Sequence, residues 1–125
     1  MTLFDKTIDT LSKSLDLQLL RQSVISDNIA NAETPHFKAR RVEFESELQK
    51  AVEANETGAM GPEITQVQPN IYQDPVSEMG QDLNTVDMDR EMAAMTKNDI
   101  QYSAGTQMIN KKFSILKYAI GEGRN

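Results

Sequence analysis

Cysteine and tryptophan are absent from this sequence of 125 residues, and aromatic residues make up only 6% of it. The lack of cysteine excludes disulfide bonds, thiolate catalysis and cysteine-ligated zinc. Hydrophobic residues make up 38% of the chain, which is below the usual share for a globular domain. This composition is enough for amphipathic helices but thin for a large core, so we expect partner chains to complete the core.

Long apolar stretches are also missing. No segment approaches the roughly 20 apolar residues that are needed to cross a bilayer, so the sequence predicts no direct membrane span. The first residues, from Met1 to Lys6, lack a basic region followed by an apolar run, which argues against a secretory signal peptide. We therefore expect that the chain, if it leaves the cytoplasm, does so without a cleaved signal.

Charge is spread unevenly along the chain, whose formal net charge is −6. Residues 1–41 carry a net charge of +1, residues 42–91 of −10 and residues 92–125 of +3. A nucleic-acid-binding protein normally presents a concentrated basic face, and this sequence has none. The pattern indicates an acidic, solvated middle segment and argues against nucleic acid as a partner.

The first third of the chain predicts one long helix. No Pro or Gly occurs between Thr2 and Thr34, and Pro35 disfavours a helical conformation in the residue before it, so we expect the helix to end near Thr34. Apolar residues recur in alternating steps of four and three, with two glutamines in a gap, as in a heptad seam. The seam consists of Phe4, Ile8, Leu11, Leu15, Gln18, Gln22, Ile25, Ile29 and Ala32, and a second stripe of Leu17, Leu20 and Val24 lies beside it.

The last third predicts a second long helix, with the strongest periodic signal in the sequence. Asn84 is expected to cap its start, Gly121 and Gly123 are expected to end it, and Gly105 is its one weak position. Steps of three and four alternate through its seam. The seam consists of Thr85, Met88, Met92, Met95, Asp99, Tyr102, Thr106, Ile109, Phe113, Leu116 and Ile120.

The segment between the two helices is irregular. Apolar residues at positions 42, 44, 48 and 52 predict a short amphipathic helix from about Glu43 to Ala54. Gly and Pro then interrupt the chain repeatedly between positions 58 and 80. Within that stretch, residues 64–67 and 71–72 are candidates for short strands or a small hairpin.

The expected fold is therefore mainly α. Two long terminal helices form an antiparallel coiled-coil-like pair, with a short helix and an irregular or small-β middle segment. We expect one structural unit made of an N-terminal helix and turn motif (residues 1–41), an acidic middle segment (42–84) and a C-terminal helix (85–125). Polar seam residues are expected to lower stability and to fix register, and each helix is equally able to pack against copies of itself. These polar residues are Gln18, Gln22, Asp99 and Thr106.

A short motif follows the first helix. Residues 28–39 read Asn-Ile-Ala-Asn-Ala-Glu-Thr-Pro-His-Phe-Lys-Ala. This resembles the N-terminal signature of flagellar rod and hook proteins, in which an Asn-Ile-Ala-Asn core is followed by Thr-Pro-Gly-Tyr. His36 stands where Gly is usual and Phe37 where Tyr is usual, and His does not easily adopt a positive φ. Residues 84–92 and 110–117 are similar to the C-terminal helix of the same family.

The resemblance implies a structural subunit of the bacterial flagellar basal-body (proximal) rod, without enzymatic activity, cofactor or metal. Such subunits leave by type III export, assemble in the periplasm and polymerise into the drive shaft that transmits torque and surrounds the export channel. The implied partners are copies of the chain, other rod proteins, the rod-base protein, the membrane ring and the export gate. The residues expected at the assembly interface are Ile8, Leu11, Leu15, Ile25, Asn28, Ile29, Asn31, Pro35, Phe37, Met92, Met95, Tyr102, Ile109, Phe113 and Leu116.

Three alternatives have weaker support. One is a soluble helical adaptor that binds a partner helix in a groove, and another is a different axial protein of the rod and hook family. An enzyme would need a nucleophile and an orienting group near His36, the only histidine, or a concave pocket around the glutamates of residues 43–53. Asp87, Asp89 and Glu91 have the spacing of a calcium loop, but at a helix start they favour stabilisation of the helix dipole.

Overall fold

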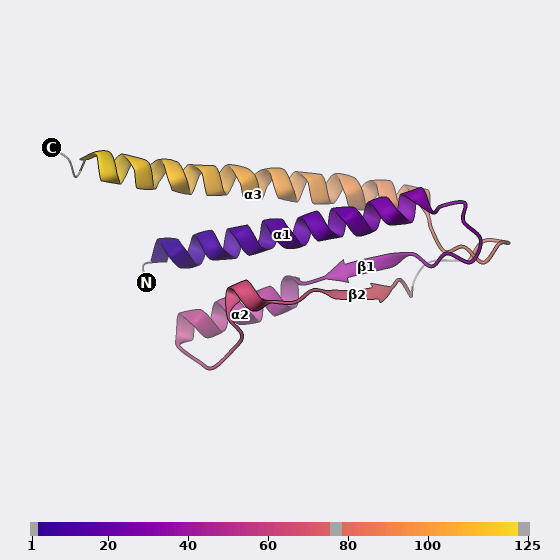
Figure 1. The fold of residues 1–125 in the computed structure, drawn as a ribbon, viewed down its shortest axis with the longest axis horizontal. Coiled ribbons are helices and arrows are strands. Elements are labelled where there is room, and N and C mark those ends of the chain that lie inside the picture. The colour runs from indigo at the N-terminus through magenta and orange to yellow at the C-terminus, as the bar shows by residue number, and fades with distance from the viewer. Residues whose placement is uncertain (1–2, 76–78, 123–125) are drawn as a thin grey trace.

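The computed structural model of the chain describes residues 3–75 and 79–122. In Figure 1, two long helices run side by side in opposite directions, and the strands and the short helix lie along the other side of the first helix. The predicted mainly α fold, with paired terminal helices and a small-β middle segment, is confirmed. The elements are α1 (Leu3–Ala30), β1 (Arg40–Glu43), α2 (Glu45–Thr57), the 3-10 helix η1 (Ile64–Gln66), β2 (Asn70–Gln73) and α3 (Met88–Glu122).

The helix α1 lies at the centre of the fold because two of its faces are covered. The predicted second stripe, which includes Leu17 and Val24, packs against the middle segment and not against α3. Phe44 anchors that segment and is 2% exposed. The buried cluster consists of Leu17, Val24, Val42, Phe44, Leu48, Ala51, Ile64 and Val67, with Leu20 and Val52 partly buried at its edge.

The helix α1 is shorter than predicted, since it ends at Ala30 and not near Thr34. The Asn31 side chain donates a hydrogen bond from Nδ2 to the Asp27 carbonyl (2.8 Å), and its Oδ1 accepts one from the Thr34 hydroxyl (3.1 Å). Such bonds between side chain and nearby backbone compete with helical ones. The helix therefore ends at the asparagine, four residues before Pro35 exerts its effect.

The short helix α2 follows the strand β1, and it begins two residues later and ends three residues later than predicted. It ends at Gly58, whose φ of 70° is a left-handed conformation that glycine adopts easily. Leu48 and Ala51 are its buried residues. The predicted amphipathic helix is thus present, with Val42 contributing from the strand before it.

The predicted strand at residues 71–72 is confirmed as part of β2, but residues 64–67 form no strand and the two segments do not pair as a hairpin. Ile64 begins the 3-10 helix η1, and both Ile64 and Val67 are buried. A spacing of three residues places side chains on one side of a 3-10 turn, which explains why this apolar pair faces the core without forming a strand. The strand β2 pairs instead with β1 in antiparallel fashion, with Ile71 opposite Val42.

The helix α3 also differs at both ends. It begins at Met88, and its cap is Asp87, whose Oδ1 accepts hydrogen bonds from the backbone amides of Asp89 (3.0 Å) and Arg90 (3.3 Å). The predicted cap at Asn84 is therefore wrong. The helix continues through Gly121 to Glu122, and Gly123 lies outside the described residues.

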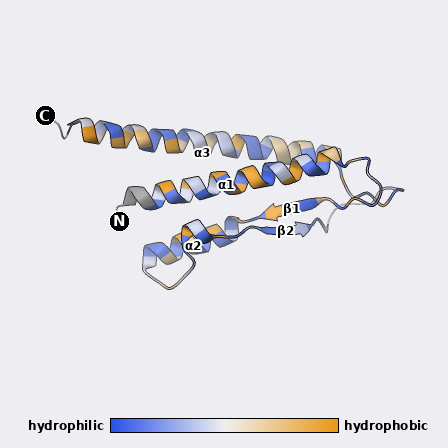
Figure 2. Cartoon of the chain, viewed as in Figure 1, coloured by the Kyte–Doolittle hydropathy of each residue, from blue (hydrophilic) through white to orange (hydrophobic). Residues whose placement is uncertain are grey.

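Hydrophobic positions recur along the whole of α3 but are mixed with hydrophilic ones, as Figure 2 shows. Of the helices in residues 3–75 and 79–122, none combines the length and the hydropathy that a membrane crossing requires.

Candidate assembly interface

About half of the predicted seam positions of α3 face α1 in the structure. Met95, Tyr102, Ile109 and Leu116 are half-buried, as expected for seam positions. The other half of the seam is shifted by one residue, so that Glu91 and Asn98 are buried while Met92 and Asp99 are exposed. The residues of α3 that are withdrawn from solvent in alternating steps of four and three are Glu91, Met95, Asn98, Tyr102, Gly105, Ile109, Lys112 and Leu116.

A polar layer lies in the middle of this seam. The Asn98 Nδ2 donates hydrogen bonds to the backbone carbonyl of Gln18 (2.9 Å) and to the Gln22 Oε1 (3.0 Å). The predicted polar layer at Gln18 and Gln22 is thus present, but it meets Asn98 and not Asp99. Within the described part of the chain, the buried oxygens Gln18 Oε1 and Asn98 Oδ1 accept no hydrogen bond.

Gly105 marks a close approach of the two helices. A Cβ atom at this position would lie 2.9 Å from Leu15 Cδ2. A methyl group there would require Leu15 to move, so the position predicted as a weak point of α3 has a packing reason to be glycine. Leu15, a predicted interface residue, is thereby placed inside the chain's own helix pair.

Because the seam is shifted, much of the apolar surface of α3 remains uncovered. Two predicted interface residues, Met92 and Phe113, are each 51% exposed. A further set on α3 is exposed as well and is not among the predicted interface residues. This set consists of Ile100, Met108, Ile115 and Tyr118.

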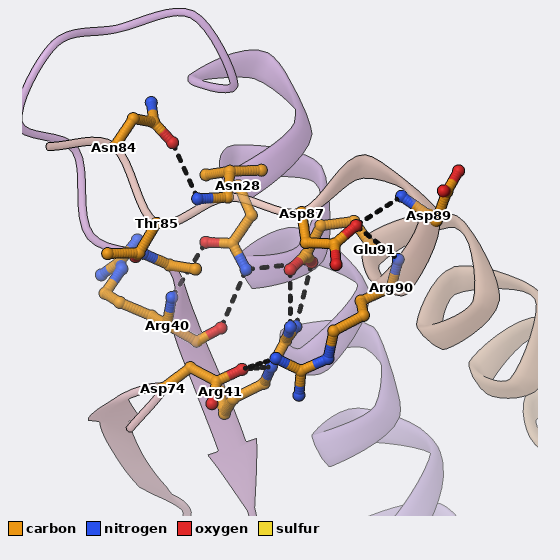
Figure 3. A network of polar contacts seen from close by, with 12 residues as sticks. Asn28, Arg40, Arg41, Asp74, Asn84, Thr85, Asp87, Asp89, Arg90 and Glu91 are labelled. Atoms are coloured by element: carbon orange, nitrogen blue, oxygen red, sulfur yellow. Dashed lines mark hydrogen bonds and ion pairs between the residues drawn. The ribbon is translucent and has the colours of Figure 1, made fainter. Parts of the chain in front are cut away.

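The turn after α1 is tied to α3 by a buried network, shown in Figure 3. Asn28, which is completely buried, lies in the last turn of α1. Its Nδ2 donates to the Arg40 carbonyl (2.9 Å) and to Glu91 Oε2 (3.1 Å), and its Oδ1 accepts from the Arg40 amide (3.0 Å). One side chain therefore joins α1, β1 and α3, which gives the first Asn of the motif a structural role.

Glu91 is the second completely buried member of the network. Arg41 donates to both of its oxygens (2.7 and 3.0 Å) and to Asp74 (2.8 Å), which Arg90 also contacts (3.0 Å). Burial alone would lower the pKa of Arg41, but the hydrogen bonds and charges of Glu91 and Asp74 outweigh burial and raise that pKa above its ordinary value. The four charges therefore stabilise one another, and removing one leaves another buried without its partner.

The loop before α3 holds the motif from the other side. The Asn84 Nδ2 donates to the carbonyls of Asn31 (2.8 Å) and Thr34 (2.7 Å). Next to it, the Thr85 hydroxyl accepts a hydrogen bond from the Ala39 amide (2.8 Å). The sequence predicts Asn84 as a helix cap and Thr85 as a seam residue, because nothing in the local pattern reveals a partner some fifty residues away in the chain.

His36 adopts the conformation for which glycine is suited. Its φ is 65°, in the left-handed region, and its amide donates a hydrogen bond to the Asp82 carbonyl (3.0 Å). Leu83, next to that acceptor, also has a positive φ of 61°. The chain therefore keeps the turn of the signature although the residue is not glycine, at a cost of roughly 1–2 kcal/mol per such residue.

The predicted interface residues therefore divide into distinct groups. Ile25 and Asn28 are buried inside the chain, Pro35 is exposed, and Met92 and Phe113 are exposed. The side chain of Phe4, a predicted seam residue, lies outside what the structure describes. The half-buried residues are Ile8, Leu11, Leu15, Ile29, Asn31, Phe37, Met95, Tyr102, Ile109 and Leu116.

Acidic groups do not converge on a cation site within residues 3–75 and 79–122. Asp87 caps α3 and Glu91 binds Arg41, so the residues with calcium-loop spacing point to different partners. Glu45, from the acidic stretch that precedes and opens α2, binds Arg21 (2.6 Å). The arrangement is that of a structural unit with an uncovered helix surface.

Comparison with known proteins agrees with this architecture. A family model described as "Flagella basal body rod protein" matches residues 8–38, which comprise most of α1 and the turn motif. Three relatives bear the name flagellar basal body rod protein FlgB. The protein of Borreliella burgdorferi is 35% identical over 84% of this chain and 88% of its own length, that of Bacillus subtilis 33% over 99% and 100%, and that of Proteus mirabilis 31% over 95% and 96%. Since the similarity extends over nearly the full length of both chains, this chain belongs to the FlgB family of flagellar basal body rod proteins.

Proposed function

We propose that the chain is a structural subunit of the flagellar basal-body rod and that it polymerises into the drive shaft that surrounds the export channel. The observation that carries this proposal is the shifted seam. Half of the α3 positions that face α1 are polar or small residues, among them Asn98 and Gly105, while other large apolar residues of α3 stay uncovered. Exposed apolar surface along a helix is typical of a chain that completes its packing with neighbours.

The interface residues take two roles in this proposal. Ile25, Asn28 and Leu15 hold the chain's own fold, whereas Met92 and Phe113 contact neighbouring subunits. Pro35 and Phe37 shape the turn that follows α1. Torque then passes through many contacts between helices, none of which is strong alone.

Location and partners follow from the same proposal. The subunit leaves through type III export and assembles in the periplasm, with the rod-base protein, the membrane ring and the export gate below it and other rod proteins above. A thin core suits passage through a narrow channel, because little packing has to be undone and neighbours offset the ordering entropy after arrival. The chain acts without catalysis, and its acidic middle segment remains solvated.

The soluble adaptor is the less favoured function. An adaptor would use its groove for a foreign helix and would not need exposed apolar residues along the whole of α3. The relatives that cover nearly the whole chain are named as rod proteins, which weighs against the adaptor.

The test is a charge placed on the uncovered surface. Phe113→Asp leaves the buried cluster of the chain untouched, because the side chain is half exposed. We expect rods and swimming to be lost while the variant is still secreted. Thr65→Asp, at an exposed position of η1, is the control and should swim normally. Normal rods in cells with only Phe113→Asp would contradict the proposal.

A further inference from the structure

One face of the C-terminal end of α3 is left exposed by the described residues of the chain. The helix has 35 residues against the 28 of α1, and Figure 1 shows it running past the first turn of α1. Lys111, Ile115 and Tyr118 are spaced by four and three residues, so they lie on one face. Ile115 is 44% and Tyr118 69% exposed. We call these three residues the tail stripe.

The same end of α3 is basic. Residues 109–122 contain three lysines and one glutamate, so their net charge is +2. Within the described residues, Lys111 and Lys117 have no acidic partner. The tail stripe therefore combines the apolar surface of Ile115 and Tyr118 with the charge of Lys111, and Lys117 lies beside it.

A groove with the complementary character lies between α1, α2 and α3. Its volume is about 610 Å³. Its walls are mainly apolar, and Glu45 and Glu53 stand among its lining residues. The helix α2, which forms one wall, carries four glutamates and one lysine, a net charge of −3. The apolar and small lining residues are Leu11, Phe44, Leu48, Val52, Ala104, Gly105 and Met108.

Glu53 is available for an ion pair. Its Oε1 accepts a hydrogen bond from Gln49 Nε2 (2.8 Å), and it has no basic partner in the described part of the chain. Glu45 differs, since Arg21 already binds it. A basic helix that enters the groove would therefore meet its strongest unpaired charge at Glu53.

We propose that the tail stripe of one copy docks in the groove between α1, α2 and α3 of a second copy. This inference rests on the proposed function. A second copy is the occupant because the same chain supplies both the basic apolar tail and the acidic apolar groove. An amphipathic helix in an apolar groove is a common recognition mode, and the opposite charges set its orientation.

The proposed contact joins two different surfaces of the chain, so each copy can bind a further copy and the series need not end in a closed dimer. A heterologous contact of this kind generates a ring or an open helical assembly. On α3, the tail stripe is centred about ten residues beyond the residues that line the groove. If the copies point the same way, each is displaced along the axis by roughly 15 Å relative to the last. An axial displacement favours the open helical form that a rod needs.

Crosslinking tests the contact directly, because the natural chain has no cysteine. Cells would produce one copy with Gln49→Cys, in the groove, and one with Ser114→Cys, at the edge of the tail stripe. Purified basal bodies would then be treated with a short bismaleimide. We expect a crosslinked dimer of the two variants. Lys50→Cys replaces Gln49→Cys as the control, since Lys50 does not line the groove, and it should give no dimer with Ser114→Cys.

Other outcomes overturn the docking without touching the rod function. The docking is overturned if both variants are present in basal bodies and no crosslinked dimer forms. It is also overturned if Lys50→Cys gives as much dimer as Gln49→Cys, or if Ser114→Cys is crosslinked only to another protein. Absence of the unmodified chain from basal bodies would contradict the proposed function instead.

A charge exchange keeps the proposal testable if the cysteine variants fail to assemble. Glu53→Lys and Lys117→Glu should each lower self-association about tenfold, because each places like charges together. The double variant restores the opposite charges and should recover most of the loss. Single variants without effect, or a double variant no better than the singles, would overturn the docking.

Discussion

Asn98 of α3 lies directly opposite Gln18 of α1, and the contact between them is incomplete. The Asn98 Nδ2 donates to the Gln18 carbonyl at 2.9 Å, yet the side-chain oxygens of both residues are buried and find no donor among the residues that the structure describes. A buried acceptor without a donor costs roughly 1–3 kcal/mol. Polar residues in such a seam fix register at the expense of stability. This layer therefore favours one register of α3 against α1 over the most stable packing of the two helices.

Replacing Asn98 by leucine should therefore stabilise the chain. Asn98→Leu removes one unsatisfied oxygen and adds apolar packing, and the freed Gln22 side chain is half exposed and can bind water. We expect the free energy of unfolding in urea, followed by circular dichroism, to rise by about 1 kcal/mol. Asp99→Leu, at the exposed neighbouring position, is the control and should leave stability nearly unchanged.

The same substitution should loosen the register of the pair. Sedimentation of Asn98→Leu should show a broader mixture of oligomers than the parent chain, because an apolar seam permits alternative alignments. A variant that is less stable than the parent would mean that the two amide hydrogen bonds outweigh the unsatisfied oxygens.

The α1–α3 seam shows which features of the fold the spacing of apolar residues can predict. The spacing alone located both long helices and four of the α3 seam positions, Met95 among them. It chose Met92 over Glu91 because apolar residues normally face a partner. That rule fails here because Glu91 finds Arg41 and Asn28 inside the fold, so its burial depends on residues that are distant in sequence.

Glycine at position 36 should stabilise the turn motif. His36 has a φ of 65°, a conformation that costs a residue with a Cβ roughly 1–2 kcal/mol. Glycine removes this cost but loses more entropy on folding, so we expect His36→Gly to raise the free energy of unfolding by about 0.5–1 kcal/mol. Lys38→Gly, at a position without positive φ, should lower it. A destabilised His36→Gly variant would show that the histidine side chain contributes more than its backbone costs.

The residues of the turn motif predict the turn itself, but they do not predict which distant residues bind it. The asparagines of the motif indicated a corner, and the structure places Asn28 and Asn31 there. The long-range partners of the motif, Asn84 and Thr85, are predicted instead as a helix cap and a seam residue. A local pattern cannot distinguish an asparagine that caps its own helix from one that binds another turn, because both need the same amide group.

The ion pair of Glu45 with Arg21 should make stability depend on pH below neutrality. Burial raises the pKa of Glu45, but hydrogen bonds and the charge of Arg21 outweigh burial and lower it below the ordinary 4.5. A lowered pKa contributes stability that is complete above the unfolded value and is lost as the pH falls through the folded value. Because the Glu45 side chain is 58% exposed, solvent screens the pair, and we expect a contribution below about 1 kcal/mol.

Urea unfolding of Glu45→Gln and of the parent chain measures this contribution. The difference between their midpoints should be constant from pH 7 to about pH 5 and should shrink below about pH 4. Gln49→Glu, which adds a carboxylate without an arginine nearby, is the control. A difference that persists at low pH would mean that the charge of Glu45 is not what stabilises the pair.

Glu91 and Arg41 should be costly to remove singly and much less costly to remove together. Glu91→Gln leaves Arg41 with one carboxylate in place of two, and Arg41→Gln leaves the buried Glu91 with Asn28 as its one partner among the described residues. We expect each to lower the free energy of unfolding by about 3 kcal/mol or more. The double variant leaves Asp74 paired with Arg90, so no charge remains unbalanced, and its loss should be well below the sum of the two.

The coupling is read from a double-mutant cycle of urea unfolding. Arg40→Gln is the matched control, since its ion pair with Asp27 is exposed at both ends and should contribute less than about 1 kcal/mol. Additive losses at Glu91 and Arg41 would mean that the two side chains act independently. A strong coupling would mean that the network fixes the start of α3 against the turn after α1. The network would then also set the direction in which the uncovered surface of α3 faces neighbouring subunits.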